Sequence, residues 1–294
     1  MLGSGSGGNS TLVAHRSQGV LIDAGLSYRQ IARRLNQIGF NPELVGAIVI
    51  THAHGDHMRG ARMFSRRHNV PVYVTETIRA DWGESDIAMW RDLCINKNQN
   101  ICGLTFYPMK ISHDASETLA FRIDTLEGAI GFATDIGVIT PELVDHFRGC
   151  RVVIVESNHA TELLRVSPYD QVTRARIGSD HGHLSNEALA EFIRTDLGPS
   201  VRCLILVHLS QVNNLPELAE ISCREALAEV GRTDVEVIVA QQNVHRVVFP
   251  NFVRRQYQNL GIHVDDALNS DFLKPLESEA RQIDASGSVD NIFI

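Results

Sequence analysis

The chain of 294 residues is long enough for one large α/β domain or two small ones with an ordinary hydrophobic core. Hydrophobic residues make up 44% and charged residues 21% of the sequence, which excludes disordered, collagenous and coiled-coil classes. The net charge of -8 excludes a global positive field that attracts nucleic acid or anionic lipid, so any polyanion must bind through a local feature.

Short apolar runs typical of strands alternate with amphipathic helical patterns through the first 240 residues. The predicted strands are 11–15, 19–23, 46–51, 70–75, 104–111, 118–124, 129–134, 152–156, 202–207 and 235–240. The predicted helices are 27–38, 57–68, 141–147, 186–195 and 216–230. This order predicts mixed sheets flanked by helices in one catalytic domain, residues 1–250. Residues 251–294 have weak periodicity, and we predict an extension of unassigned role.

No apolar run approaches the roughly 18 residues of a membrane helix, and residues 1–11 lack the basic and apolar regions of a secretory signal. We therefore expect a cytoplasmic protein that does not span a membrane. The five cysteines are scattered and form no C-x-x-C pair, so they predict neither a disulfide framework nor a thiolate zinc site.

Three histidines and an aspartate lie within residues 51–57, which read T-H-A-H-G-D-H, between a predicted strand and a predicted helix. Imidazole and carboxylate groups suit divalent Zn, Mn or Fe. His52 and His54 can face one ion from a turn while Asp56 and His57 face a second. Composition alone produces this pattern in about one chain in a thousand. A two-metal centre is therefore favoured over the alternative, a solvated polar loop.

This motif resembles the signature of the metallo-β-lactamase superfamily, which implies an α/β fold of αββα sandwich type, with two facing mixed sheets flanked by helices. The resemblance implies further ligands after later strands, namely His113 in K-I-S-H-D-A, Asp135 in G-F-A-T-D-I-G and His208 in L-I-L-V-H-L-S. It also implies that Asp23, in V-L-I-D-A-G, supports the ligands through hydrogen bonds. A plain turn residue is the alternative for Asp23.

The implied ligands divide into two sets for two divalent metal ions. One ion would be held by His52, His54 and His113, the other by Asp56, His57 and His208, with Asp135 bridging both. Two such ions balanced by two carboxylates leave positive charge, which favours a bridging hydroxide and an anionic substrate.

Further stretches resemble the YycJ/WalJ family of cytoplasmic nucleases. They are G-S-G-S-G-G-N-S-T near the start, L-I-D-A-G-L-S, V-E-S-N-H, H-G-H-L-S-N and H-L-S-Q-V-N-N. The resemblance covers about residues 3 to 250 and implies a 5′ to 3′ exonuclease with DNA as its partner. Too few residues separate Asp135 from His208 for the cap domain of β-CASP nucleases, and the long flexible arm of ribonuclease Z is not apparent.

The implied reaction is in-line attack of the bridging hydroxide on phosphorus, with Asp56 and Asp135 among the catalytic groups. We predict that His183 contacts the phosphate, because it precedes a predicted helix start and the seven ligand positions are already filled. The other predicted substrate contacts are His159, His181, Ser185, Asn186 and Arg59. Ser185 or Asn186 is alternatively only a helix N-cap.

Three other functions remain compatible with the sequence. The same fold supports a thioesterase or lactonase of the glyoxalase II type, in which the hydroxide attacks a carbonyl carbon. A nuclease directed at RNA uses the same phosphodiester chemistry. A metal-bound sensor without turnover is disfavoured, because a binding module has little use for two open metal sites. The H-G-H-L-S-N stretch favours a phosphate substrate.

Overall fold

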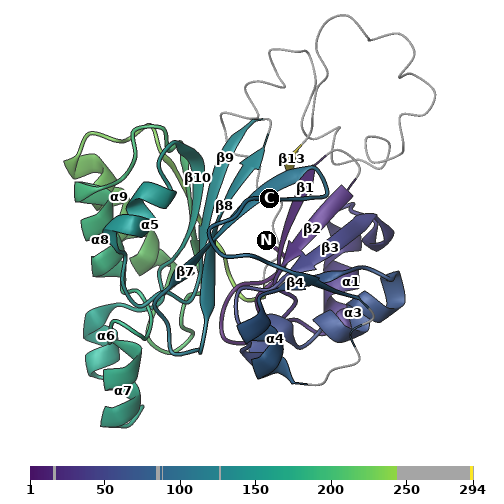
Figure 1. The fold of residues 1–294 in the computed structure, drawn as a ribbon. Helices are drawn as coiled ribbons and strands as arrows, with labels where there is room; N and C mark the ends of the chain where they lie inside the picture. Colours follow the sequence, from purple (N-terminus) through teal and green to yellow (C-terminus); the bar gives the residue numbers. More distant parts are fainter. Residues whose placement is uncertain (16–17, 84–86, 88, 126, 244–291, 294) are drawn as a thin grey trace, which may run out of the picture.

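Two β-sheets face each other and helices cover their outer sides in the computed structural model, which describes residues 1–15, 18–83, 87, 89–125, 127–243 and 292–293 (Figure 1). This arrangement confirms the predicted αββα sandwich. Buried side chains from both sheets, such as Leu21, Ile48, Phe106 and Phe121, form the central core. The layers are held together mainly by the burial of these apolar surfaces.

The first sheet contains six strands in the described part of the chain. In spatial order they are β13 (Ile292–Phe293), β1 (Thr11–His15), β2 (Gln18–Ile22), β3 (Val45–Val49), β4 (Val72–Val74) and β5 (Trp90–Asp92). Strands β2 to β5 run parallel, whereas β1 is antiparallel to both of its neighbours. The helical elements of this half are α1 (Tyr28–Gln37), η1 (Pro42–Leu44), α2 (Gly55–Met58), α3 (Ala61–His68) and α4 (Glu76–Trp82). The predicted mixture of strand directions is therefore present.

Within the described ranges, the second sheet contains seven strands. In spatial order they are β12 (Glu236–Val239), β11 (Cys203–Val207), β10 (Cys150–Glu156), β9 (Gly128–Ala133), β8 (Thr118–Thr125), β7 (Leu104–Ile111) and β6 (Gln99–Ile101). Strands β9 to β12 run parallel and β6 to β9 antiparallel. The helices of this half are α5 (Pro141–His146), α6 (Thr161–Arg165), α7 (Gln171–Ile177), α8 (Asn186–Thr195) and α9 (Pro216–Glu229). Figure 1 shows α5, α8 and α9 on the outer side of this sheet.

The end of the predicted extension, residues 251–294, returns to the first sheet. Ile292 pairs with His15 and Phe293 with Ala14. Residues 251–291 lie outside the described residues, so the predicted boundary at 250 stays a prediction. Within the described ranges, every helix is too short or too polar to cross a bilayer.

The predicted single helix 57–68 is wrong, because the structure contains two helices, α2 and α3, separated at Arg59 and Gly60. Gly60 N donates to Ala24 O at 2.7 Å, and Ala24 N donates to His57 O at 2.7 Å. A Cβ atom on Gly60 would lie 2.1 Å from Leu26 O. The backbone therefore turns against the loop after β2, and this contact fixes the position of His57.

Gly60→Ala is expected to lower the free energy of unfolding by about 1–3 kcal/mol, because the added methyl group overlaps a backbone carbonyl. Gly55→Ala is the matched control, since a Cβ there would meet no atom within 4 Å. Denaturant unfolding of both variants measures the difference. Equal stability of the two variants would show that the close approach at Gly60 is not required.

Polar residues follow the carboxyl ends of parallel strands from both sheets. Asp23 follows β2, Asp135 follows β9 and His208 follows β11. All three have left-handed backbones, with φ values of 60°, 53° and 56°. This conformation is unfavourable for residues other than glycine and is concentrated at functional sites. The strand ends thus turn sharply and bring these side chains to one edge of the sandwich.

Candidate metal centre

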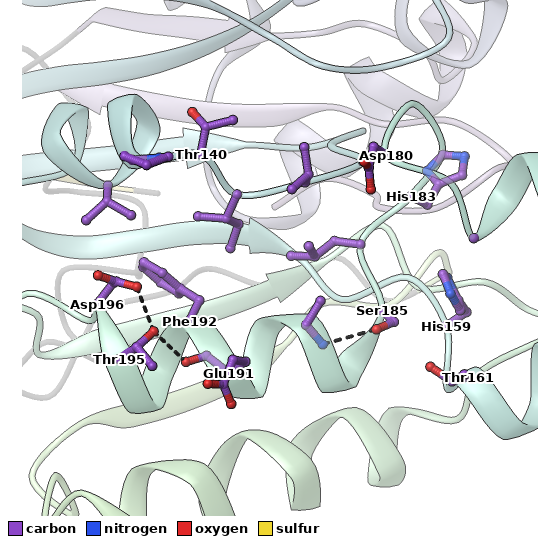
Figure 2. Close-up of a pocket in the computed structure, with 18 of the residues that line it drawn as sticks. Thr140, His159, Thr161, Asp180, His183, Ser185, Glu191, Phe192, Thr195 and Asp196 are labelled. Carbon is purple, nitrogen blue, oxygen red and sulfur yellow. Dashed lines mark hydrogen bonds between the residues drawn. The ribbon is translucent and has the colours of Figure 1, made fainter.

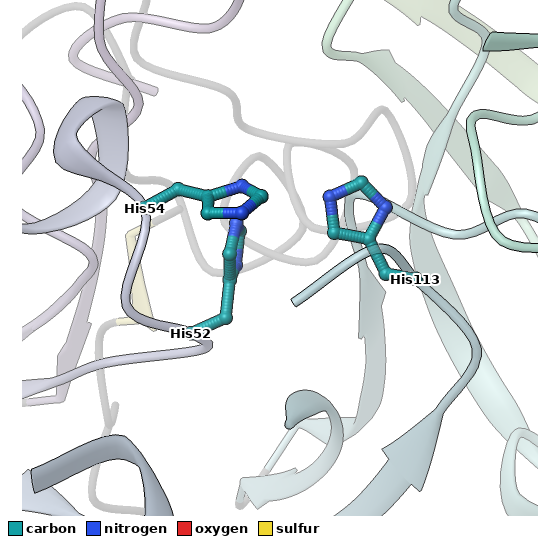
Figure 3. Close-up of side chains that lie close together, drawn as sticks. All are labelled: His52, His54 and His113. Carbon is teal, nitrogen blue, oxygen red and sulfur yellow. The ribbon is translucent and has the colours of Figure 1, made fainter. Parts of the chain in front are cut away.

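One group of histidines converges between the two sheets. His52 and His54 extend from the loop after β3, and His113 faces them from the loop after β7 (Figure 3). One ring nitrogen from each residue lies within 4.8 Å of the other two. The structure therefore brings the first predicted ligand set together.

The second predicted set lies beside the first. His57 Nε2 is 3.7 Å from Asp56 Oδ2, and His208 Nε2 is 3.9 Å from the same oxygen. Asp135, which is only 2% exposed, lies between the sets. Its Oδ2 is 3.1 Å from His57 Nε2, and its Oδ1 is 3.7 Å from His113 Nε2. This is the position that a bridging ligand requires.

Asp23 determines which nitrogen of two histidines carries the proton. Its Oδ2 accepts from His57 Nδ1 at 2.7 Å, and its Oδ1 accepts from Thr51 N at 2.8 Å. The Thr51 hydroxyl donates to Asp23 and so accepts from His52 Nδ1 at 2.9 Å. Both imidazoles consequently direct the Nε2 lone pair at the site. Hydrogen bonds of this kind typically orient metal-ligating histidines.

The same arrangement recurs at two further histidines. His113 Nδ1 donates to Gly182 O at 2.9 Å, and His208 Nδ1 donates to Glu156 Oε1 at 2.7 Å. Within the described part of the chain, the buried Nε2 atoms of His52, His113 and His208 and Oδ2 of Asp135 have no hydrogen-bond partner. Unpaired buried polar atoms are costly. Lone pairs directed at one centre by neutral imidazoles and a carboxylate are the donor set that divalent metals bind, so the residues fit such ions.

The carboxylates create a strongly negative environment. Burial opposes the charged form of His208, yet Asp135, Asp56 and Glu156 raise its pKa to about 10. Burial likewise opposes ionisation of Asp135, yet His208 and His57 hold its pKa well below the usual range. Without a metal ion, this field favours a proton on His208. A divalent cation is attracted by the same field and would compete with the proton for the imidazole lone pair, and its binding would leave the ring neutral.

Glu156, which the sequence analysis did not identify, holds two histidines in place. Its Oε2 accepts from Ile136 N at 2.9 Å and Leu184 N at 3.1 Å. Its Oε1 contacts Nδ1 of both His208, at 2.7 Å, and His183, at 2.8 Å. Despite complete burial, the neighbouring His183 lowers the pKa of Glu156 to about 2. Both oxygens already accept hydrogen bonds, so Glu156 is placed to orient ligands.

Two more residues at the site were missed. Asn9 Nδ2 lies 2.9 Å from His57 Nε2 and 3.4 Å from Asp56 Oδ2. Asp114 Oδ1 lies 3.1 Å from His113 Nε2. Asn9 is at the end of the Gly/Ser-rich stretch near the start of the chain, and Asp114 directly follows the predicted ligand His113. Their positions next to these motifs could have identified both residues as members of the site.

The predicted substrate contacts occupy different environments. His183 is at the edge of the metal cluster, with its Nδ1 3.9 Å from Asp135 Oδ1. His159 and Ser185 are joined by a parallel backbone bridge beside it. His181 is exposed and contacts the Ser112 hydroxyl at 2.9 Å.

Arg59 is also exposed, and it donates to Gly7 O at 3.4 Å. Ser185 is the N-cap of α8, with its hydroxyl accepting from Ala188 N at 3.1 Å. Asn186 is 3% exposed, and its amide bonds to Ser157 and Asn214. Its side chain is engaged within the fold, and we propose no substrate contact for it.

Comparison with known proteins agrees with this geometry. A family model described as a beta-lactamase superfamily domain matches residues 18–209. Exodeoxyribonuclease WalJ of Streptococcus pneumoniae serotype 2 is 31% identical over 238 residues, which cover 78% of this chain and 87% of WalJ. Exodeoxyribonuclease YycJ of Bacillus anthracis is 29% identical over 246 residues, which cover 79% of this chain and 89% of YycJ.

Among solved structures, the metallo-β-lactamase-fold protein YhfI from Bacillus subtilis superimposes with a TM-score of 0.62. The two chains share 14% identity over 82% of this chain and 95% of YhfI, so the likeness concerns the fold. Together, these matches show that the chain belongs to the β-lactamase superfamily and, within it, to the family of the WalJ and YycJ exodeoxyribonucleases. It is a metal-dependent hydrolase.

Cysteines are not required for activity if this centre performs the chemistry. None of the four candidate ligand groups in the described chain contains a cysteine. Burial raises the pKa of Cys150 to about 11 and that of Cys223 to about 12, which disfavours the nucleophilic thiolates. A variant with all five cysteines replaced by Ser or Ala should retain turnover. Inactivity of that variant in a folded, metal-loaded form would overturn this expectation.

Proposed function

We propose that the protein is an exonuclease that degrades DNA from the 5′ end and uses two divalent metal ions. The observation that carries the proposal is the pair of ligand sets that meet at Asp135. The exodeoxyribonuclease names of its WalJ and YycJ relatives support DNA as the substrate. A cytoplasmic location fits this role and stays a prediction, as does the choice among Zn, Mn and Fe.

In this proposal, His52, His54 and His113 hold one ion, and Asp56, His57 and His208 hold the other. Divalent ions bound there supply activated water and neutralise charge on the phosphate oxygens. Asp135 joins the two sets, while Asp23 and Glu156 orient the imidazoles through Nδ1. This orientation keeps the ligand lone pairs directed inward before substrate arrives, which lowers the reorganisation needed during the reaction.

His183 is positioned to contact the substrate. Glu156 holds its Nδ1 at 2.8 Å, and its side chain is 19% exposed, in contrast to the 4% exposure of the His208 side chain. We propose that His183 contacts the phosphate group of the substrate at the edge of the cluster. Arg59, His181 and Ser185 are placed on the surrounding surface, where we propose weaker substrate contacts.

Two small substrates separate phosphodiester from carbonyl chemistry. The metal-loaded protein is expected to hydrolyse bis(p-nitrophenyl) phosphate and to leave S-lactoylglutathione intact. Initial rates on both compounds, with metal content measured on the same preparation, provide the test. Hydrolysis of S-lactoylglutathione alone would replace the nuclease proposal with a thioesterase. Inertness towards both compounds, in protein with full metal content, would contradict a hydrolytic role on either bond.

A further inference from the structure

A pocket of about 690 Å³ opens beside the metal cluster, between α8, which it follows to the C-terminal end, and the chain after β9. We call it the α8 pocket; its walls include Ile139, Val144, His159, His183, Ser185 and Phe192. His183 belongs both to this wall and to the cluster around Asp135. The volume lies within the range of sites that bind small organic ligands, roughly 300–1,000 Å³.

The two ends of the α8 pocket differ in chemistry. Figure 2 shows His159, His183 and Ser185 at one end, and Glu191, Thr195 and Asp196 at the other, where Phe192 lies beside Asp196. Apolar side chains, among them Ile139, Leu164 and Leu184, also line the pocket. The arrangement suits a ligand with a flat, partly apolar body and a polar group at its histidine end.

His159 provides an independent indication that a ligand binds at the histidine end. Its side chain lines the pocket although the residue is only 3% exposed, and its Nδ1 atom has no hydrogen-bond partner in the described structure. A buried imidazole nitrogen without a partner is costly unless a ligand pairs with it. The backbone bridge to Ser185 places His159 next to the N-cap of α8.

The acidic end determines how such a ligand would lie. Asp180 also places a carboxylate at the histidine end, where His159 and His183 stand beside it. At the other end, Asp196 and Glu191 would repel a phosphate group, whereas their carboxylates accept hydrogen bonds from the amino groups of nucleobases. Arg148, which also lines the pocket, is paired with Asp145 and adds little free positive charge. A nucleotide therefore fits with its sugar and phosphate towards the histidines and its base towards Phe192.

We infer that the α8 pocket receives the 5′-terminal nucleotide of the DNA strand, with its base against the apolar wall and its sugar-phosphate beside His159 and His183. This inference rests on the proposed exonuclease function. The terminal nucleotide is then the leaving group. Water forms a bond to the scissile phosphorus, the bond from phosphorus to the 3′ oxygen of the terminal nucleotide breaks, and the proton from water ends on that oxygen. From a strand that begins with a 5′-phosphate, the products are a nucleoside 5′-monophosphate and a strand that is one nucleotide shorter and carries the cleaved phosphate at its new 5′ end.

Product binding tests the base contact without relying on catalysis. Titration calorimetry on the metal-loaded protein should give a Kd for deoxyadenosine 5′-monophosphate that is at least about tenfold lower than that for 2-deoxyribose 5-phosphate. Inorganic phosphate serves as the probe for binding at the metals alone. Equal affinity for the nucleotide and the sugar phosphate would overturn the inference, because the base would then contribute nothing.

Filling the pocket tests its location. Ala188 is exposed on α8 and lines the pocket, so Ala188→Trp occupies the space with little disturbance of the core. This variant should lose the preference for the nucleotide over the sugar phosphate. Its exonuclease rate should fall at least about tenfold more than its rate on bis(p-nitrophenyl) phosphate. Ala228→Trp is the matched control, because Ala228 is exposed near the end of α9 and does not line the pocket.

A second variant covers the case in which Ala188→Trp does not fold. Ala188→Leu fills less of the pocket and favours helix, and it should reduce the nucleotide preference in part. Retention of the full preference by either folded variant would refute the assigned pocket. Failure of the unmodified, metal-loaded protein to cleave any phosphodiester would refute the proposed function instead, and the binding titrations would still decide whether the pocket takes a nucleotide.

Discussion

Replacing Asp135 with alanine is expected to abolish hydrolysis and to lower the metal content of the protein. Asp135 is buried between the two ligand sets, with Oδ2 3.1 Å from His57 Nε2 and Oδ1 3.7 Å from His113 Nε2. Its removal deletes the negative ligand that both ions would share and leaves neighbouring imidazoles without a counter-charge. Elemental analysis and rates on bis(p-nitrophenyl) phosphate measure the two effects.

Asp81→Ala is the control for this substitution, because Asp81 is an exposed carboxylate on α4. The control should keep both its metal content and its rate. Circular dichroism and melting temperature establish that the Asp135 variant is folded. A folded Asp135→Ala protein with two metals and full activity would contradict the bridging role.

Replacing His183 with alanine is expected to slow hydrolysis by about 100- to 1000-fold, the usual contribution of one positioned donor to the transition state. The metal content should remain that of the unmodified protein, since all seven predicted ligands are retained and His183 is not among them. His183 is held by Glu156 at 2.8 Å and borders the α8 pocket, so its removal takes a donor from the substrate side of the cluster. The measurements are kcat, metal stoichiometry and melting temperature on one preparation.

The competing roles of His183 produce different results. His183, Asp135, Glu156 and His208 have ligand atoms within 4.8 Å of one another, so a metal-depleted His183→Ala protein would make His183 a ligand. A lower melting temperature with an unchanged rate would make it structural. Partial recovery of the rate by His183→Asn, which retains a side-chain donor, would support the phosphate contact.

The ligands could be predicted because their chemistry is local in sequence. His52, His54, Asp56 and His57 occupy one short turn, and Asp135 and His208 each end an apolar strand. Parallel strands bring their carboxyl ends to one edge of a sheet, so strand ends in the right order indicate proximity. The structure brings all seven predicted ligands into one cluster, and their metal-binding roles stay predictions until metals are measured.

Features that depend on long-range contacts were missed. The break between α2 and α3 arises where Gly60 packs against Ala24 and Leu26. The spacing of apolar residues along the sequence gives no indication of this contact. In the sequence, Glu156 is the last residue of a predicted apolar strand. Its hydrogen bonds to His183 and His208 depend on the folded structure, so they could not be predicted. The strands β5 and β6, with three residues each, are too short to show an alternating pattern.

The most direct test of the central claim uses duplex and single-stranded DNA and RNA labelled at the 5′ or the 3′ end, incubated with protein of measured metal content. We expect 5′-labelled DNA to release labelled mononucleotides from the first turnover, while 3′-labelled DNA shortens progressively. We further expect that removal of the metals stops both reactions and that their return restores them. Intact DNA after incubation with protein that carries two metals per chain, or cleavage that is unchanged after the metals are removed, would contradict a metal-dependent exonuclease.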